Sequence, residues 1–354
     1  MLTRGSSSIL YVGIYIGEAI SAQISNSFRK TGTSWRVALR AIGIVGLVLA
    51  ILLRAILREP PRQSSLVEDL HHHPSEANEA DPNDRHARQE RAKTTFRETV
   101  SYVIRMRSFW LLAISAGLRQ LGGVTFGYYM PSYLQLLYPN VANFTSHYGI
   151  IVGVVGSFAV IAGGYVSSVL WRRTVLFPLY MTAIGGMISS IFVILMVFSR
   201  QIADGSEARG SKVLYGVMTL AYLTAELWLG AFNTLFVFLL PPRYKTFALA
   251  IYMTVVVFIY SSGPAIVGLA LRKTSPKSPG YLRDVRVVLA VIIPAGYWIA
   301  GIGFLFAVRL VRQDLSNEKP TSQVSRTKKL GLSSGVFVLG ALVIALFVAS
   351  IVYR

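Results

Sequence analysis

Long apolar runs alternate with short polar connections along most of the chain. We count about nine runs with the length that a helix needs to cross the hydrocarbon core of a membrane. They cover residues 8–27, 35–57, 108–137, 147–170, 175–198, 212–240, 245–271, 286–311 and 332–353. The chain shows no strict two-residue alternation of the kind found in barrel strands. The pattern therefore predicts an all-α, multi-pass membrane protein.

The first run, residues 8–27, is the most polar of the set. It contains Glu18 and Gln23, so we expect it to insert only when neighbouring helices cover these side chains. Gly13 and Gly17 stand four residues apart, which is the spacing that lets two membrane helices approach closely. This run is therefore predicted to be a packed helix rather than a lipid-exposed one.

Residues 59–106 interrupt the apolar pattern. They contain four prolines and nine of the sixteen acidic residues of the chain, a composition typical of a disordered linker. The three histidines His71–His73 suggest either a metal-binding tract or a solvated part of this linker, and the lack of a fixed ligand geometry nearby favours the second interpretation. The end of the segment, from Lys93 to Arg107, fits a basic amphipathic helix on the membrane surface.

The overall composition agrees with a membrane protein. Hydrophobic residues make up 53% and charged residues 14% of the chain, against about 25% charged residues in an ordinary soluble domain. The net charge of +19 would suggest a nucleic-acid partner for a soluble protein. Here the basic residues lie mostly between the apolar runs, where they determine membrane orientation, so we predict no nucleic-acid binding.

The loop charges predict which side of the membrane each connection faces. The connections 54–107, 171–174, 241–245 and 309–329 are basic, which places them in the cytoplasm. Five basic residues between Arg272 and Arg286 lie on the opposite side and weaken this asymmetry. The sequon Asn143-Phe144-Thr145 falls in a predicted outer loop, so Asn143 is a candidate glycosylation site.

Several motifs stand in an order and spacing typical of one transporter family. They are the stretch Trp35-Arg36-Val37-Ala38-Leu39-Arg40 with its ending Arg58-Glu59-Pro60-Pro61-Arg62, the glycine-rich run 148–173 that ends in Arg172-Arg173, and the residues Ala225-Glu226, Asn233 and Gly263-Pro264 within 225–268. Through these motifs, roughly residues 5–312 resemble the major facilitator superfamily and, within it, the Spinster-like transporters. The chain departs from that pattern at Val256 and at Ile259-Tyr260, where Spinster-like proteins often carry a His and a Gly-Asp.

The resemblance implies a partial major facilitator fold that lacks counterparts of the first four helices. Residues 1–58 would be a two-helix remnant of the N-terminal half-bundle, and 59–106 the cytoplasmic central loop. Residues 107–312 would form the six-helix C-terminal half-bundle, followed by a basic linker at 313–331 and an additional transmembrane helix at 332–354.

Charged groups are rare inside the predicted spans. Glu18 and Glu226 are the two carboxylates there, and Arg119, followed by Gln120, is the one basic residue deep in a span. Counting about 1.5 Å per residue places Arg119 and Glu226 near the membrane midplane, where transporters of this type bind their cargo. In the resembled fold the helices that carry them line the central cavity.

Three roles are open for these residues. Arg119 and Glu226 form an intramembrane pair that only holds two helices together, or Arg119 binds an anionic group while Glu226 takes up a proton. Glu18 either has a structural or lipid-contacting role or takes part in function. Asn233 is either an interhelical hydrogen-bonding residue or a ligand. The aromatic residues Tyr129, Tyr133 and Trp228 either line an amphipathic cavity or belong to interface belts and ordinary packing.

The resemblance implies a secondary active transporter that moves an amphipathic lipid-like or organic anionic solute by alternating access. Its partners would be membrane lipids, the solute and protons, and its location the plasma membrane or an endolysosomal or vacuolar membrane. Two alternatives remain: a truncated, transport-inactive scaffold or regulator, and a sugar or drug carrier of the same superfamily. The chain contains no Walker loop, zincin helix or nucleophile elbow, so we predict neither an enzyme nor a cofactor. The oligomeric state is not predicted.

Overall fold

The computed structural model describes residues 3–32, 34–56, 96–171, 173–241, 244–272, 274–275, 278 and 280–316. Every regular element within these ranges is a helix, as the apolar pattern predicts. Most of the expected linker, the histidine tract and the expected span 332–353 lie outside the described residues.

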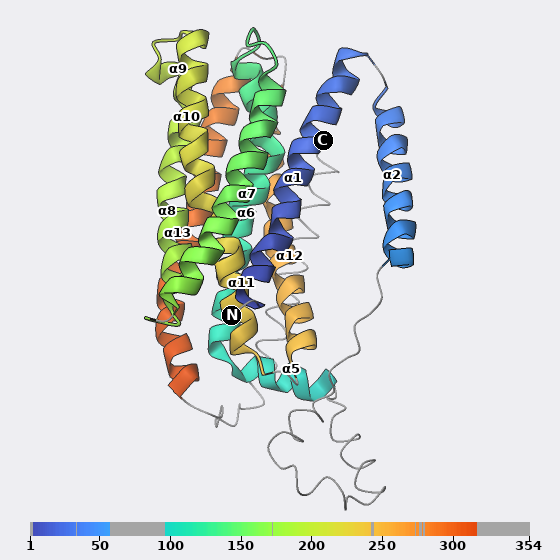
Figure 1. Cartoon of the computed structure of the whole chain (residues 1–354). Helices are drawn as coiled ribbons and strands as arrows, with labels where there is room; N and C mark the ends of the chain where they lie inside the picture. The colour runs from blue at the N-terminus through green and yellow to red at the C-terminus, as the bar shows by residue number, and fades with distance from the viewer. Residues whose placement is uncertain are drawn as a thin grey trace, which may run out of the picture. The chain divides into compact units, whose positions relative to one another are not determined.

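Figure 1 shows the described helices along the chain. In chain order they are α1 (Thr3–Lys30), α2 (Trp35–Ile56), α5 (Phe96–Arg105), α6 (Arg107–Leu137), α7 (Phe144–Leu170), α8 (Phe177–Val197), α9 (Ser199–Ile202), α10 (Glu207–Glu226), α11 (Trp228–Leu239), α12 (Lys245–Ala270) and α13 (Tyr281–Ser316).

Eight of the expected spans coincide with these helices, with differences at their ends. Within the described residues, six helical stretches are long and apolar enough to cross a membrane, namely Arg36–Ile56, Phe144–Leu170, Phe177–Val197, Glu207–Leu239, Lys245–Ala270 and Tyr281–Ser316. The run 286–311 is extended to the 36 residues of α13, because its polar flanks continue the helix beyond the apolar part. The run 212–240 is interrupted at Leu227, which separates α10 from α11.

The chain divides into two compact units. One unit joins the first 23 residues to everything from Phe96 onward, and the other comprises Ile24–Thr95. The first part of α1 therefore groups with the helices that follow the linker. The second unit contains α2, an apolar helix of 22 residues. Our division of the chain at residues 58 and 106 stays a prediction.

In the larger unit, α6 lies at the centre and packs against α12 and α13 (Figure 1). Helix α13 also contacts α8, while α10 and α11 pack on α7 and α8. Glycines permit the close approach of α6 and α13. A Cβ atom added to Gly296 would lie 3.0 Å from the Leu118 carbonyl oxygen, and one added to Gly122 would lie 3.0 Å from the Tyr297 ring. Small residues at such crossings are typical of membrane helices.

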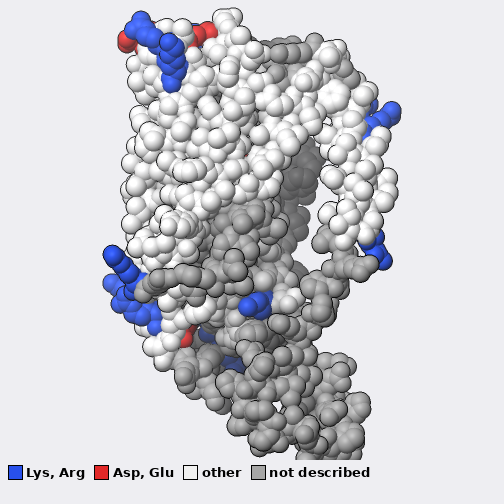
Figure 2. Space-filling view, viewed as in Figure 1, with Lys and Arg blue, Asp and Glu red and all other residues white. Residues whose placement is uncertain are grey.

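Charged side chains gather at the ends of this bundle. Figure 2 shows Lys, Arg, Asp and Glu over α9 and α10 at one end and at the opposite end, with an uncharged face between them. Large apolar side chains of α7, such as Val154, Phe158 and Tyr165, are exposed. Such a band is expected where a protein meets lipid rather than water.

The amphipathic helix expected between Lys93 and Arg107 coincides with α5, which spans Phe96–Arg105, and its place on the membrane surface stays a prediction. Its Tyr102 ring stacks on Tyr244, just before α12, with 4.7 Å between ring centroids. The Trp110 indole nitrogen donates to the Val103 carbonyl at 3.1 Å, which fixes α5 to the start of α6. Burial raises the pKa of the Tyr102 phenol, so this aromatic contact stays uncharged at neutral pH.

Candidate functional site

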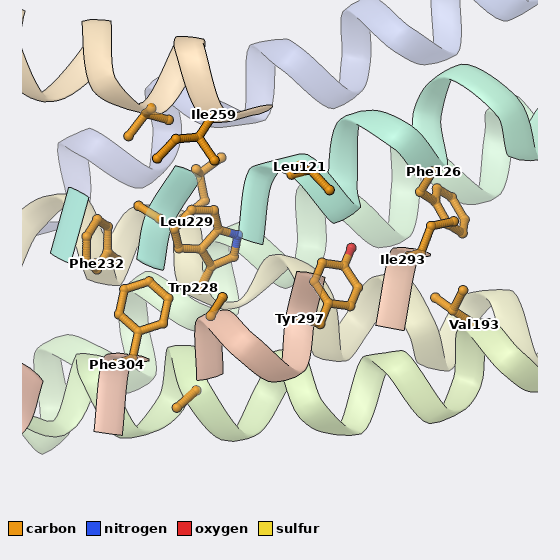
Figure 3. Close-up of a cluster of buried hydrophobic side chains, with 14 of the residues drawn as sticks. Leu121, Phe126, Val193, Trp228, Leu229, Phe232, Ile259, Ile293, Tyr297 and Phe304 are labelled. Carbon is orange, nitrogen blue, oxygen red and sulfur yellow. The ribbon is translucent and has the colours of Figure 1, made fainter. Parts of the chain in front are cut away.

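Arg119 lies in the middle of α6 and is almost completely buried, with 3% of its surface exposed. Its guanidinium carbon lies 4.7 Å from the Trp228 ring centroid and 5.0 Å from the Tyr297 ring centroid. Figure 3 shows these two rings next to each other, from α11 and α13, with the indole nitrogen on the side of Tyr297. Gly186 of α8 leaves room for the group, since a Cβ there would lie 2.6 Å from Arg119 Nη1. Four helices, α6, α8, α11 and α13, thus meet around the Arg119 cation. We name the surroundings formed by Gly186, Trp228 and Tyr297 the aromatic socket.

The guanidinium of Arg119 has unused hydrogen-bonding capacity. Its Nη2 donates to the carbonyl oxygen of Ala225 on α10. Within the part of the chain that the structure describes, its Nε and Nη1 atoms are buried and have no hydrogen-bond partner. Arginine keeps its charge in proteins, so these donors persist at any physiological pH. Buried donors without acceptors are costly, and the socket therefore favours an anionic ligand.

Glu226 is the last residue of α10 and is half-buried. Its carboxylate accepts a hydrogen bond from the Tyr15 hydroxyl of α1, 211 residues away in the chain. No ion pair joins Arg119 to Glu226 among the described residues, where Arg200–Glu207 is the one pair found. The two groups lie at neighbouring positions of the site, as their depth in the sequence predicts, but each binds an uncharged partner.

A one-residue irregularity lies beside this site. Leu227 separates α10 from α11 but keeps a helical conformation, with φ −55° and ψ −26°, so Glu207–Leu239 runs as one helical stretch. The carbonyl oxygen of Leu227 points so closely at Gly163 of α7 that a Cβ there would overlap it. Six residues earlier, the Ala221 carbonyl accepts from Ser189 Oγ of α8 at 3.0 Å.

The remaining polar candidates surround the site without contacting Arg119. Gln120 follows Arg119 in α6 and is half-buried. Asn233 Nδ2 donates to the Leu229 carbonyl of its own helix at 2.8 Å, so this hydrogen bond is not interhelical. Glu18 lies one turn after Tyr15 on α1 and is exposed, although its charge still acts on Glu226.

Of the three candidate cavity aromatics, Trp228 alone borders Arg119. The Tyr129 hydroxyl donates to the Pro264 carbonyl at 3.1 Å. The Tyr133 hydroxyl donates to the Val197 carbonyl at 2.9 Å and accepts from Arg286 Nε at 3.2 Å. These two tyrosines therefore join α6 to neighbouring elements towards the end near α9.

Sequence reasoning missed Tyr15 and Tyr297. Both tyrosines lie within apolar runs of the sequence and have 5% of their surface exposed. No local spacing distinguishes them from residues that only pack. The position of Tyr15 one turn before Glu18 is the one signal that was available. Asn143 precedes α7, is exposed and has φ 54°, a left-handed conformation that asparagine tolerates. Its glycosylation stays a prediction.

A second charged cluster lies near α9. Arg200 Nη2 and Glu207 Oε1 form an ion pair at 3.2 Å, and we name this the outer ion pair. Arg200 also donates to the carbonyls of Leu137 at 2.9 Å and Gly205 at 3.2 Å. The Glu207 carboxylate accepts from the Asn140 backbone nitrogen at 3.4 Å. This cluster joins the end of α6 to the start of α10.

The described residues contain no group of three or more His, Asp or Glu side chains that could hold a metal ion. The site around Arg119 brings together a cation, a carboxylate and two aromatic rings.

Comparisons with known proteins give two findings. The family model described as Major Facilitator Superfamily matches residues 5–264. A solved bacterial homolog of the human lysosomal transporter Spinster, in an inward-facing and unoccupied conformation, is similar in fold with a TM-score of 0.59. The match covers 86% of this chain and 70% of that one at 17% sequence identity. At this identity the similarity shows a shared fold and nothing about the solute. A search of the curated proteins found no match.

Proposed function

The chain belongs to the major facilitator superfamily, and from that premise we propose that it moves an amphipathic organic anion across a membrane by alternating access. As a member of this family it is a multi-pass membrane transporter and not an enzyme. The substrate class is the proposed part, and it rests on the site around Arg119.

The observation that carries the proposal is a pair of unpartnered donors on the Arg119 guanidinium. The two buried atoms, Nε and Nη1, lie on different sides of the group and have no acceptor within the described residues. An oxygen of a carboxylate or phosphate would supply an acceptor for such a donor. The negative group of the solute would thus replace a missing hydrogen-bond partner inside the membrane.

The surroundings of the socket support a solute with an apolar body. Trp228 lies 5.5 Å from Phe232, and Phe232 lies 5.3 Å from Phe304, measured between ring centroids (Figure 3). This aromatic row continues from the cation into the apolar core. A solute that combines a negative head group with an apolar chain matches both parts, whereas a sugar matches neither.

We assign proton exchange to Glu226. A half-buried carboxyl group inside a membrane span is a default candidate for such a role. Its neighbour Arg119 would sense the bound anion, so substrate and proton would influence each other through one electrostatic site. Since the structurally similar protein is a homolog of a lysosomal transporter, an acidic endolysosomal compartment is the favoured location.

The test is uptake by the reconstituted full chain in proteoliposomes. The panel contains a labelled lysophospholipid, a small organic anion, an uncharged amphiphile of matched chain length and a labelled sugar. We expect uptake of the anionic amphiphile, loss of that uptake in Arg119→Ala, and retention of it in Arg200→Ala, which removes a cation outside the site.

Two outcomes would contradict the proposed transport of an anionic amphiphile and favour another function. Sugar or neutral-drug uptake that ignores Arg119→Ala would indicate a different carrier of the superfamily. Absence of uptake for every compound, in a protein that is folded by circular dichroism and thermal melting, would favour a scaffold or regulator.

A further inference from the structure

Tyr15 connects three helices of the larger unit. It lies on α1 with 5% of its surface exposed, and its ring packs on α7, where a Cβ added to Gly156 would overlap it. Its hydroxyl reaches past α7 and donates to the carboxylate of Glu226 at the end of α10. One residue therefore contributes to the α1–α7 packing and also binds the carboxyl group of the candidate site.

The rest of the contact between α1 and α7 is made by small groups. Ala19 and Ala22 lie so close to Gly153 and Gly149 that a Cβ on either glycine would overlap an alanine methyl group. Gln23 Nε2 donates to the Ser146 carbonyl at 3.1 Å near one end. Such a contact has few large side chains that interlock, so it permits small shifts of one helix along the other. At the other end of this contact, Tyr15 packs on Gly156 and its hydrogen bond to Glu226 ties α1 to α10.

Five titratable or charged groups face Glu226 from the elements around it. They are Tyr15 and Glu18 on α1, Arg119 on α6, Tyr222 on α10 itself and Tyr297 on α13. Arg119 binds the Ala225 carbonyl, and the Tyr222 hydroxyl pairs with that of Tyr148 at 3.2 Å. Tyr15 donates its hydrogen bond to the carboxylate itself, so a change in the charge of Glu226 acts directly on Tyr15.

We propose that Tyr15 is a positioning residue that couples the charge of Glu226 to the packing of α1 on α7. The proposal rests on the transport function and the proton-exchanging role of Glu226 given above. With Glu226 ionised, the phenol donates to an anion, and this charge-assisted bond holds α1 in place. When the carboxyl group takes a proton from water, the bond becomes a neutral one of roughly half the strength. Helix α1 is then released to shift along the glycine face of α7, and loss of the proton to water restores the tie.

The chain offers a clean test because it contains no cysteine. Ile20 on α1 and Val154 on α7 are 55% and 66% exposed, so the pair Ile20→Cys and Val154→Cys accepts spin labels without disturbing the core. Distances between the labels are measured by pulsed electron paramagnetic resonance on the full chain in lipid nanodiscs, across a pH series. We expect two distance populations whose ratio changes about tenfold between the ionised and protonated limits.

The variants separate the hydroxyl from the ring. Tyr15→Phe keeps the ring on Gly156 and removes the donor, so the pH dependence of the distances should disappear, as it should in Glu226→Gln. Tyr11→Phe, which removes a hydroxyl one turn earlier on the same helix, should behave like the unmodified protein. A Tyr15→Phe protein that keeps the full pH response would overturn the proposal, and so would an unmodified protein that shows no response.

Uptake measurements on the same variants distinguish this inference from the function on which it rests. If the distances respond to pH as described but no solute is transported, the transport proposal fails while the coupling by Tyr15 stands. If uptake depends on Arg119 but the distances ignore pH, the coupling fails while the transport proposal stands.

Discussion

Arg200 lies close to Glu207 of α10, and Arg119 lies close to Glu226 of the same helix. Within the described residues Arg200 forms an ion pair with its glutamate, and Arg119 does not. Glu207 is the first residue of α10 and Glu226 is the last. The outer ion pair measures 3.2 Å, with 35% and 22% of the two side chains exposed. Arg119 is 3% exposed and donates to the Ala225 carbonyl instead of the carboxylate beside it.

The positions of the two glutamates along the helical stretch Glu207–Leu239 differ. A carboxylate in the first turn, such as Glu207, is stabilised by the free N–H groups and the positive end of the helix dipole. Glu226 lies inside the stretch, where Arg119 binds the Ala225 carbonyl and Tyr15 donates to the carboxylate. The charges of the outer ion pair are bonded to each other, whereas Arg119 keeps two donors without a partner among the described residues.

The largest effect is expected from Arg119→Ala. Removing a charged donor that makes two hydrogen bonds to the solute should lower uptake of the anionic amphiphile by about 100-fold. The measurement is initial uptake in proteoliposomes, normalised to folded protein. Unchanged uptake in this variant would contradict the proposal that Arg119, unlike Arg200, binds the solute.

The next largest effect is expected from Glu226→Gln. A proton driven by about 100 mV supplies about 2.3 kcal/mol, which corresponds to roughly 50-fold accumulation of a coupled solute. This variant should abolish that accumulation while downhill exchange of the solute continues. The check is accumulation with and without an imposed proton gradient, with Glu207→Gln as the matched control. Gradient-driven accumulation that survives in Glu226→Gln would assign coupling to another group.

A smaller effect is expected from Arg119→Lys. Lysine keeps the charge but loses the planar group that lies against the Trp228 and Tyr297 rings, and it loses the two free guanidinium donors. The apparent affinity for the solute should fall about tenfold, with the maximal rate less affected. Concentration-dependent uptake separates the two quantities. Equal affinities for the lysine variant and the unmodified protein would indicate that charge alone is recognised.

The smallest effect is expected from Arg200→Ala. A partly exposed ion pair contributes up to about 1 kcal/mol, so the free energy of unfolding should fall by that order and uptake should change less than about twofold. Thermal melting at low and high salt measures the first effect, because screening weakens exposed pairs. If Arg200→Ala lost transport without loss of stability, the outer ion pair would have a functional role after all.

Much of the fold could be predicted from the apolar pattern. Eight expected spans are helices, and the amphipathic segment expected at Lys93–Arg107 contains α5 at Phe96–Arg105. The family resemblance is confirmed by the match over residues 5–264. Helix ends were predicted less well, since α13 extends through polar residues that a hydropathy pattern excludes. The interruption at Leu227 has no local signal, because an apolar residue with helical dihedral angles separates the two helices.

The sequence singled out Arg119 and Glu226 by their depth in the spans, since helical rise converts sequence position into height in the membrane. The functional role of the two residues stays a prediction. Which atoms meet depends on helix rotation and on distant segments, and neither is encoded in local spacing. Of the two arrangements that the sequence left open, the ion pair is absent among the described residues: Arg119 binds the Ala225 carbonyl, and Glu226 binds Tyr15 from 211 residues away.

The joint at Leu227 determines how far a small change beside the site would carry. The 12 residues of α11 make an arm of about 18 Å, so a tilt of about 10° around Leu227 would move the far end near Leu239 by roughly 3 Å. The joint lies against Gly163, and the Ala225 carbonyl two residues earlier accepts from Arg119. We therefore expect a change of angle beside Arg119 and Glu226 to be magnified at the other end of α11.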